Sequence, residues 1–227
     1  MFDLHKVPLP AYSRKEDMVN SVSHAIGVPL CILGTVMLLK LQMGKVAPIQ
    51  IAATLLYTLS TMLVFLGSAI YHGIRPGFAK RVLRVLDHSN IYLMISGSVT
   101  AFFIAHILDS RPAFAKGIIA AVWIASAVGI LFTFMDLKRF NIPQVFMYLA
   151  LGWTSILGMR TIWHMGQAGK EYVLTVLLGS VFVSVGTGIY LIGKKVRYFH
   201  AVFHVFVLIG TVVMFIATYR YFGVKLA

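Results

Sequence analysis

The residues best suited to chemistry lie in the segment YFHAVFHVFVLIG, residues 198–210, where His200 and His204 stand four positions apart. On a helix this spacing places both side chains on one face, one turn apart. Two imidazoles in that arrangement can bind one metal ion, as the paired histidines of an H-E-x-x-H helix bind zinc. Two histidines do not complete a zinc site, so the pair predicts further ligands on other segments. The alternative is that each ring is only packed or hydrogen-bonded.

Candidate partners occur in two other segments. GSAIYHG carries Ser68 and His72, again four positions apart, and LDHSNIY carries Asp87. His72 is a candidate third ligand, and Asp87 a candidate proton acceptor beside it. The alternatives are that Ser68 hydrogen-bonds its own helix and that Asp87 caps the start of the next helix.

The segment EDMVNSVSH places Asp17, Asn20 and His24 on one side of a helix, at steps of three and four. We expect these residues to support the histidines. Asp17 could instead be a solvated first-turn carboxylate that favours the helix dipole, and Asn20 could bridge two helices. We treat His88 as structural or interfacial, and we set aside His5, His106 and His164, which fall in the leader or at the opposite membrane face.

The composition predicts which elements hold these residues. The chain has 227 residues, of which 59% are hydrophobic and only 12% charged, about half the charge of a soluble domain. A membrane helix needs about 20 mostly apolar residues. We therefore predict an all-α bundle of seven transmembrane helices that forms a single domain over residues 1–227, after a cytoplasmic leader of residues 1–17. The seven runs that lack Asp, Glu, Lys and Arg are Met18–Leu39, Val46–Ile74, His88–Leu108, Gly117–Met135, Phe140–Met159, Tyr172–Gly193 and Tyr198–Tyr219.

The positive charge of the chain predicts its orientation. The net charge is +13, and the basic residues fall in short connections, where they act as topology signals rather than as a nucleic-acid surface. Twelve Lys and Arg lie on the side of the N-terminus and eight on the other side. This bias predicts a cytoplasmic N-terminus and an outer C-terminus, and it places all the candidate site residues in the cytoplasmic leaflet. The single cysteine, Cys31, excludes an intrachain disulfide.

These segments carry a family resemblance that covers nearly the whole chain, from AYSRKEDMVNSVSHAIG to HAVFHVFVLIG. The chain resembles bacterial members of the hemolysin III family, which are related to the progestin and adipoQ receptors and, more distantly, to the alkaline ceramidases. The resemblance implies seven helices and a zinc ion held by His72, His200 and His204. Asp87 then matches the aspartate beside the water on the metal, and Ser68 matches the serine of the S-x-x-x-H motif.

The chain departs from the family pattern in two places. Asp17, Asn20 and His24 match the motif E-x-x-N-x-x-[ST]-H, but an aspartate stands where the family usually has glutamate, and Glu16 precedes it. Which of the two acids acts is left open. Ala101 stands in SVTAF where bacterial relatives commonly have proline.

Together these observations suggest a zinc enzyme of membrane lipids. Three histidines leave an open position on zinc, which can activate water and polarise a carbonyl. Asp87 would take the proton of the water or hold the water in line, and Ser68 would hydrogen-bond the water or a developing oxyanion. The expected partner is an amide-linked or ester-linked acyl lipid of the bacterial cytoplasmic (inner) membrane, and the expected role is membrane lipid homeostasis. A non-catalytic sensor or receptor with structural zinc is the alternative; a haemolytic pore ranks last, because the spans lack a polar lining.

Overall fold

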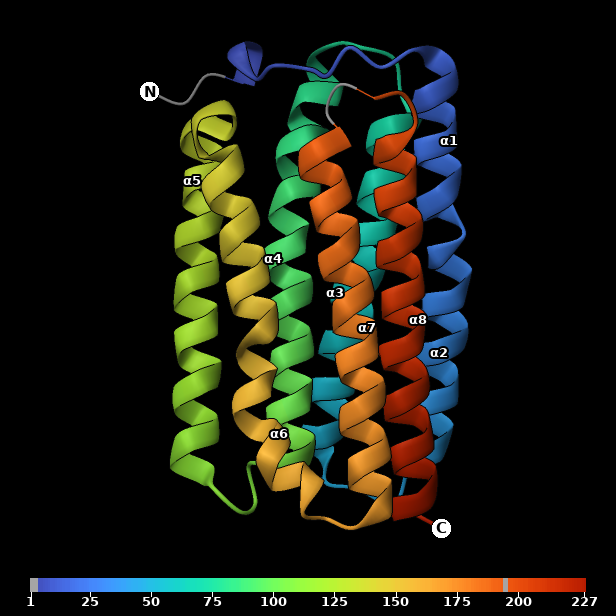
Figure 1. The fold of residues 1–227 in the computed structure, drawn as a ribbon, viewed down its shortest axis with the longest axis vertical. Coiled ribbons are helices and arrows are strands. Elements are labelled where there is room, and N and C mark those ends of the chain that lie inside the picture. The colour runs from blue at the N-terminus through green and yellow to red at the C-terminus, as the bar shows by residue number, and fades with distance from the viewer. Residues whose placement is uncertain (1–3, 194–195) are drawn as a thin grey trace.

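The protein is an elongated bundle of roughly parallel and antiparallel helices, with the N-terminus at one end and the C-terminus at the other (Figure 1). The computed structural model describes residues 4–193 and 196–227, and in that part of the chain it contains helices and no strand. Lys194 and Lys195, which contribute to the predicted charge bias, lie outside the described residues. The all-α prediction is confirmed.

The helices follow one another through short connections. In chain order they are η1 (Leu4–Lys6), α1 (Arg14–Ala25), α2 (Gly27–Gln42), α3 (Pro48–Gly73), α4 (Phe78–His106), α5 (Pro112–Gly152), η2 (Trp153–Ser155), α6 (Ile156–Trp163), α7 (Gln167–Ile192) and α8 (Phe199–Lys225). α1 and α2 are joined at the single residue Ile26 and form one rod (Figure 1).

Local sequence signals explain where several helices begin. Ser13 caps α1 through a capping box: its hydroxyl accepts from the Glu16 backbone N–H, and the Glu16 carboxylate accepts from the Ser13 N–H at 2.9 Å. Pro48 and Pro112 start α3 and α5, where a missing N–H costs no hydrogen bond. Glu16 is therefore used in building the helix start.

The long helix α5 is divided at Asp136. This residue has φ −161° and ψ 92°, which are not helical values, and the chain turns back on itself there (Figure 1). The Asp136 carboxylate accepts from the Arg139 backbone N–H at 2.9 Å, in the manner of an N-cap. The two parts of α5 correspond to the separate predicted runs Gly117–Met135 and Phe140–Met159. The second part continues through η2 into α6.

Five helical stretches of the described chain are long and apolar enough to cross a membrane. They are Arg14–Gln42, Pro48–Gly73, Pro112–Trp163, Gln167–Ile192 and Phe199–Lys225. The predicted run His88–Leu108 lies in α4, which starts ten residues earlier, at Phe78, and carries Lys80, Arg81, Arg84 and Asp87 in its first turns.

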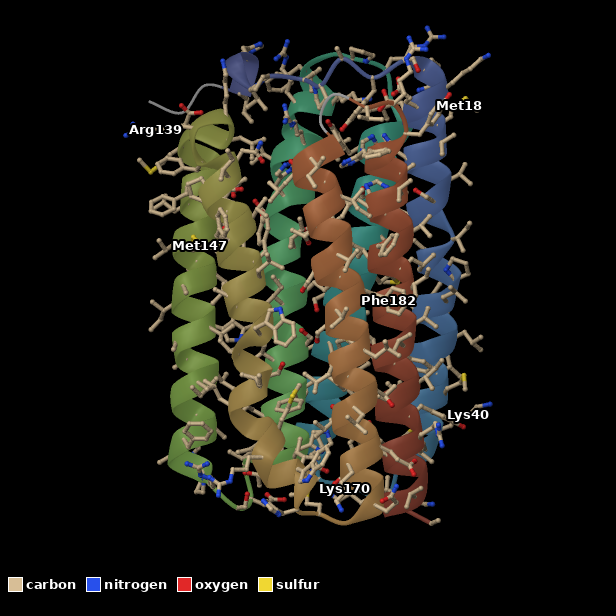
Figure 2. The ribbon with its side chains drawn as sticks, in the orientation of Figure 1. Met18, Lys40, Arg139, Met147, Lys170 and Phe182 are labelled. Carbon is tan, nitrogen blue, oxygen red and sulfur yellow. The ribbon has the colours of Figure 1, made fainter. Side chains whose placement is uncertain are left out.

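The outer surface of the bundle is apolar, as expected for contact with lipid. Large side chains such as Leu131 and Leu174 are 57% and 55% exposed. Polar atoms gather instead at the two ends, with Arg139 at the end of the N-terminus and Lys40 and Lys170 at the opposite end (Figure 2). This distribution is that of an integral membrane protein.

Two glycines allow α7 and α8 to pack closely. A Cβ atom at Gly210 would lie 2.8 Å from the Gly179 carbonyl oxygen, and one at Gly179 would lie 2.9 Å from the Gly210 carbonyl oxygen. Such backbone contact replaces the hydrophobic driving force that helices lack within lipid. The pair fixes α8, the helix of the two histidines.

We therefore expect Gly210→Ala to lower the free energy of unfolding by about 1–3 kcal/mol, because the new methyl group overpacks a backbone contact. The measurement is the unfolding midpoint in detergent micelles. Gly223→Ala is the matched control on the same helix, since nothing lies within 4 Å of its Cβ position. Equal midpoints for the two variants would contradict the close approach.

Candidate metal centre

Three histidines converge at the end of the bundle that holds the N-terminus. His72 extends from the last turn of α3, and His200 and His204 extend from the first turns of α8. One ring nitrogen of each lies within 4.8 Å of the other two. The Nε2 atoms of His72 and His200 are 3.2 Å apart, close to the separation of about 3.3 Å expected for two ligands of a tetrahedral zinc ion. The three side chains thus form a donor set that fits one metal ion.

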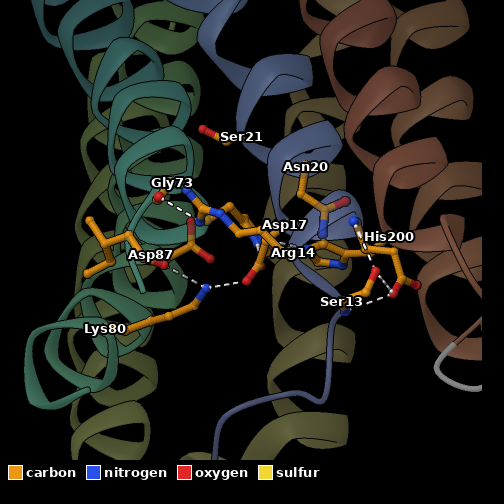
Figure 3. Close-up of polar contacts among 12 residues, drawn as sticks. Ser13, Arg14, Asp17, Asn20, Ser21, Gly73, Lys80, Asp87 and His200 are labelled. Carbon is orange, nitrogen blue, oxygen red and sulfur yellow. Dashed lines mark hydrogen bonds and ion pairs between the residues drawn. The ribbon is translucent and has the colours of Figure 1, made fainter. Parts of the chain in front are cut away.

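The site depends on contacts that hold α1 against the end of α3. The Arg14 guanidinium donates to the Gly73 carbonyl oxygen at 2.9 Å (Figure 3). The Ser21 hydroxyl donates to the Ala69 carbonyl oxygen at 2.7 Å. Gly73 is the last residue of α3, so its carbonyl lacks an intrahelical donor, whereas the Ala69 carbonyl accepts the Ser21 hydroxyl as a second donor. These bonds place the α1 side chains beside His72.

Asp17 orients His72. Its Oδ1 atom lies 3.0 Å from Nδ1 of His72, and its Oδ2 atom accepts from Lys80 Nζ at 2.5 Å (Figure 3). Lys80 is 3% exposed and also donates to the Ile74 carbonyl oxygen at 3.2 Å. A histidine that donates Nδ1–H to a carboxylate presents Nε2 to a metal. Asp17, and not Glu16, is therefore the acid at the site, and its charge is balanced by a buried ammonium group.

His204 is oriented by the backbone of α1. Its Nδ1 atom lies 3.1 Å from the Asn20 carbonyl oxygen and 3.1 Å from the Ser23 hydroxyl. The His24 ring stacks on the His204 ring, with centroids 3.6 Å apart and planes 19° apart. The predicted support from Asn20 thus comes from its main chain. The Asn20 amide atoms and both His24 ring nitrogens are buried, with no hydrogen-bond partner among the described residues.

Aromatic rings surround His200, whose Nδ1 atom has no hydrogen-bond partner among the described residues. Tyr12 stacks on it with centroids 5.4 Å apart, and Tyr190 lies on another side at 5.8 Å. Tyr12 belongs to the segment before α1 and also approaches the His72 ring, at 5.8 Å. Burial raises the pKa of the Tyr12 phenol well above its usual value, so Tyr12 covers the site as a neutral ring.

Asp87 and Ser68 lie next to each other across α3 and α4. The Ser68 side chain hydrogen-bonds the Asp87 carboxylate, and His88 Nδ1 is 3.8 Å from the same carboxylate. The alternative that Asp87 caps the start of its helix is wrong, because α4 begins at Phe78. The orientation of the His88 ring is fixed by its own helix, because Nδ1 lies 3.0 Å from the Arg84 carbonyl oxygen.

A cavity of about 250 Å³ leads away from these residues along the bundle. Ser68, Asp87 and His204 line its upper end, together with His200 and His24. The far end is lined by aromatic residues and by His106, whose ring lies 4.7 Å from Tyr172 and 4.8 Å from Tyr221. His106, set aside on sequence grounds, is thus a cavity residue.

The cavity walls are apolar in effect although they carry hydroxyl groups. Ser180, Ser184 and Thr187 on α7 all line the cavity, yet each donates its hydroxyl hydrogen to a carbonyl oxygen four residues back. Thr218 on α8 does the same. These hydroxyls satisfy their donors within their own helices, so the interior suits hydrocarbon.

Sequence reasoning missed three contributors: Lys80, Ser23 and Tyr12. Lys80 was counted only as a topology signal, because α4 was expected to start after it. Ser23 is the [ST] position of the matched motif, so a signal for it was present. Tyr12 lies outside every helix, and no spacing rule points to it.

Comparisons with known proteins identify the family of the chain. The family model described as Haemolysin-III related matches residues 12–215. The chain is 31% identical over 210 residues to the Hemolysin-3 homolog of Bacillus subtilis (strain 168), covering 92% of this chain and 96% of that protein. It is 28% identical over 207 residues to Hemolysin-3 of Bacillus cereus, covering 91% and 92%. The match spans α1 to α8 and includes all three histidines, so this chain belongs to the haemolysin-III-related family of membrane proteins.

Proposed function

We propose that this protein is a zinc-dependent hydrolase that cleaves amide-linked or ester-linked acyl lipids and serves membrane lipid homeostasis. One observation carries the proposal: the nitrogens of His72, His200 and His204 meet at one point. Two of these histidines, His200 and His204, line a hydrocarbon-like cavity together with Asp87 and Ser68. A site that only held helices together would not need a carboxylate and an acyl-sized cavity beside it.

The proposal includes a topology of seven crossings with the N-terminus in the cytoplasm. Two features support the count: α5 turns back at Asp136, and α4 is 29 residues long. The excess of basic residues at the end of the N-terminus supports the orientation. The site then lies in the inner leaflet of the cytoplasmic membrane, near the headgroups of its lipids.

The donor set suits zinc. Neutral imidazoles favour zinc among the common divalent ions, and here two of the three rings have an oriented Nδ1. Three protein ligands leave one position open, as in catalytic zinc sites. A zinc ion held there would supply Lewis-acid activation of water and of a lipid carbonyl.

The residues around the three histidines have different roles in the proposed reaction. Asp87 accepts the proton of the attacking water, because its carboxylate lines the cavity. Asp17 cannot take this role, since one of its oxygens contacts His72 and the other accepts from Lys80. Ser68 positions Asp87 through their hydrogen bond, a more specific role than the oxyanion contact expected from sequence.

A second candidate is a non-catalytic sensor or receptor in which the metal only clamps helices. The arrangement of α3 and α8 favours this candidate. The two helices both supply histidines to the site, but their backbones scarcely approach each other. A metal ion would then be a principal link between them.

The metal site is tested by His200→Ala. We expect purified wild-type protein to retain stoichiometric zinc after dialysis, and the variant to lose most of it, because two imidazoles hold zinc far more weakly than three. Elemental analysis of the purified protein measures this. His164→Ala is the control, since His164 is exposed and remote from the three histidines in the fold. Unchanged zinc in His200→Ala would refute the site.

Hydrolysis is tested by Asp87→Asn. We expect this variant to keep its zinc and to lose about 10²- to 10⁴-fold in turnover, the usual contribution of a general base. The assay follows fatty acid released from amide-linked and ester-linked lipids in proteoliposomes by mass spectrometry. Zinc and lipid binding without product, even in excess lipid, would favour the sensor over the enzyme.

The buried pair of Asp17 and Lys80 is tested by a double-variant cycle. Lys80→Met alone should cost about 3–5 kcal/mol of stability, because it leaves a buried carboxylate unpaired. Asp17→Asn with Lys80→Met should recover most of that loss, yet zinc affinity should stay about 10- to 100-fold below wild type, since His72 has lost its orienting carboxylate. Full recovery of zinc affinity in the double variant would show that Asp17 does not orient His72.

A further inference from the structure

A second hollow lies outside the cavity, beneath α2. It is a groove of about 180 Å³ between α2, α3 and α8. Cys31 and Gly34 line it from α2, Phe65 from α3, and Phe215 from α8. Its walls expose almost no polar atoms. The lining residues lie near the middle of the three membrane-spanning stretches.

The groove and the inner cavity share a thin wall. Tyr57, Thr61 and Thr211 line both hollows. The neighbouring residues Met214 and Phe215 show the division, because the first lines the cavity and the second the groove. The backbones of α3 and α8 scarcely approach each other, and α2 packs against both helices. Beneath α2, side chains of α3 and α8 therefore separate the groove from the cavity.

The wall residues are suited to passing hydrocarbon. The Thr61 hydroxyl donates to the Tyr57 carbonyl oxygen at 2.7 Å, so its donor is satisfied within α3. The structure gives no hydrogen bond to the Tyr57 hydroxyl among the described residues, and the residue keeps some exposure. Rotation of one unbonded aromatic side chain would therefore connect the groove to the cavity.

We propose that the groove binds one acyl chain of a bilayer lipid, and that the chain passes between α3 and α8 at Tyr57 to enter the inner cavity. The occupant follows from position and chemistry: at mid-depth of the bilayer only hydrocarbon is available, and a protein partner would meet none of the polar rim that interfaces carry. This inference rests on the proposed function for its substrate class, and it adds the side from which the substrate arrives.

The test uses vesicles of phosphatidylglycerol and phosphatidylethanolamine that contain phosphatidylcholine with a diazirine at the middle of one acyl chain. After irradiation, adducts are mapped by mass spectrometry at Met37, which lines only the groove, and at Met94, which lines only the cavity. We expect adducts at both positions in the wild-type protein.

Two variants act on the route in opposite directions. Leu30→Trp fills the groove from α2, where Leu30 is 42% exposed, and should lower adducts at both methionines about tenfold, as for a loss of one decade in affinity. Tyr57→Ala removes the wall and should raise adducts at Met94. Leu174→Trp is the matched control, since Leu174 is 55% exposed on α7 and lines neither hollow.

The outcomes separate this inference from the proposed function, because the adducts need neither zinc nor turnover. Loss of adducts at Met37 with unchanged adducts at Met94 in Leu30→Trp would overturn the route, and so would wild-type protein without adducts at Met37. If neither variant changes the adducts at Met94 while the protein still hydrolyses lipid, the route is refuted and the proposed enzyme activity stands. Adducts that respond as expected in a protein that releases no product would refute the enzyme and leave the route.

Discussion

The site depends on one hydrogen bond, between the Asp17 carboxylate and Nδ1 of His72. Inside a membrane protein a carboxylate is costly unless its charge is compensated, and here Lys80 provides the compensation at 2.5 Å. The pair is locally neutral, so it can sit beside the histidines without adding net charge to a low-dielectric region. Its position is set in turn by Arg14 and Ser21, which bind carbonyl oxygens of Gly73 and Ala69 near the end of α3. The end of α3, the start of α1 and the start of α4 thus form one connected unit, and His72 is aimed by that unit as a whole.

The rest of the bundle divides into closely packed and hollow regions. α7 and α8 touch through Gly179 and Gly210, which anchors the helix that carries two of the histidines. The space between α3 and α8 is instead open enough to hold a cavity of about 250 Å³. The hydroxyl groups of Ser180, Ser184 and Thr187 are turned to their own helices, which leaves the α7 wall of the cavity apolar in character. A rigid frame around an apolar interior is the arrangement that an acyl chain requires.

Much of this could be predicted from sequence because the membrane imposes simple rules. Runs without charge located the helices, and even the turn at Asp136 fell between two predicted runs. The spacing of His200 and His204, with His72 at the end of another run, was enough to expect that they meet. What could not be predicted was the use of individual groups: that the backbone and not the side chain of Asn20 contacts His204, or that Glu16 builds a helix cap. These outcomes depend on how far α1 is rotated about its axis and shifted along α3. The hydrophobic periodicity of the sequence does not determine either quantity. Lys80 was missed for a related reason, since the same charge that marks topology also completes a buried pair.

The enzyme and sensor proposals share one structural consequence. His72 on α3 and the two histidines of α8 draw these helices together at one end, whereas an acyl chain passing at Tyr57 would part them near the middle. Both ligands therefore act on the same seam. By linkage, any effect of lipid in the seam on metal affinity must be matched by an equal effect of the metal on lipid affinity. If α3 and α8 are rigid near the headgroups and flexible near the middle of the membrane, lipid binding and metal binding affect each other little, which suits turnover. If the two helices move as one body, each ligand strongly changes the affinity for the other, which suits sensing. The division between the two functions thus lies in how stiffly α3 and α8 are held between His72 and Tyr57, a stretch of four helical turns.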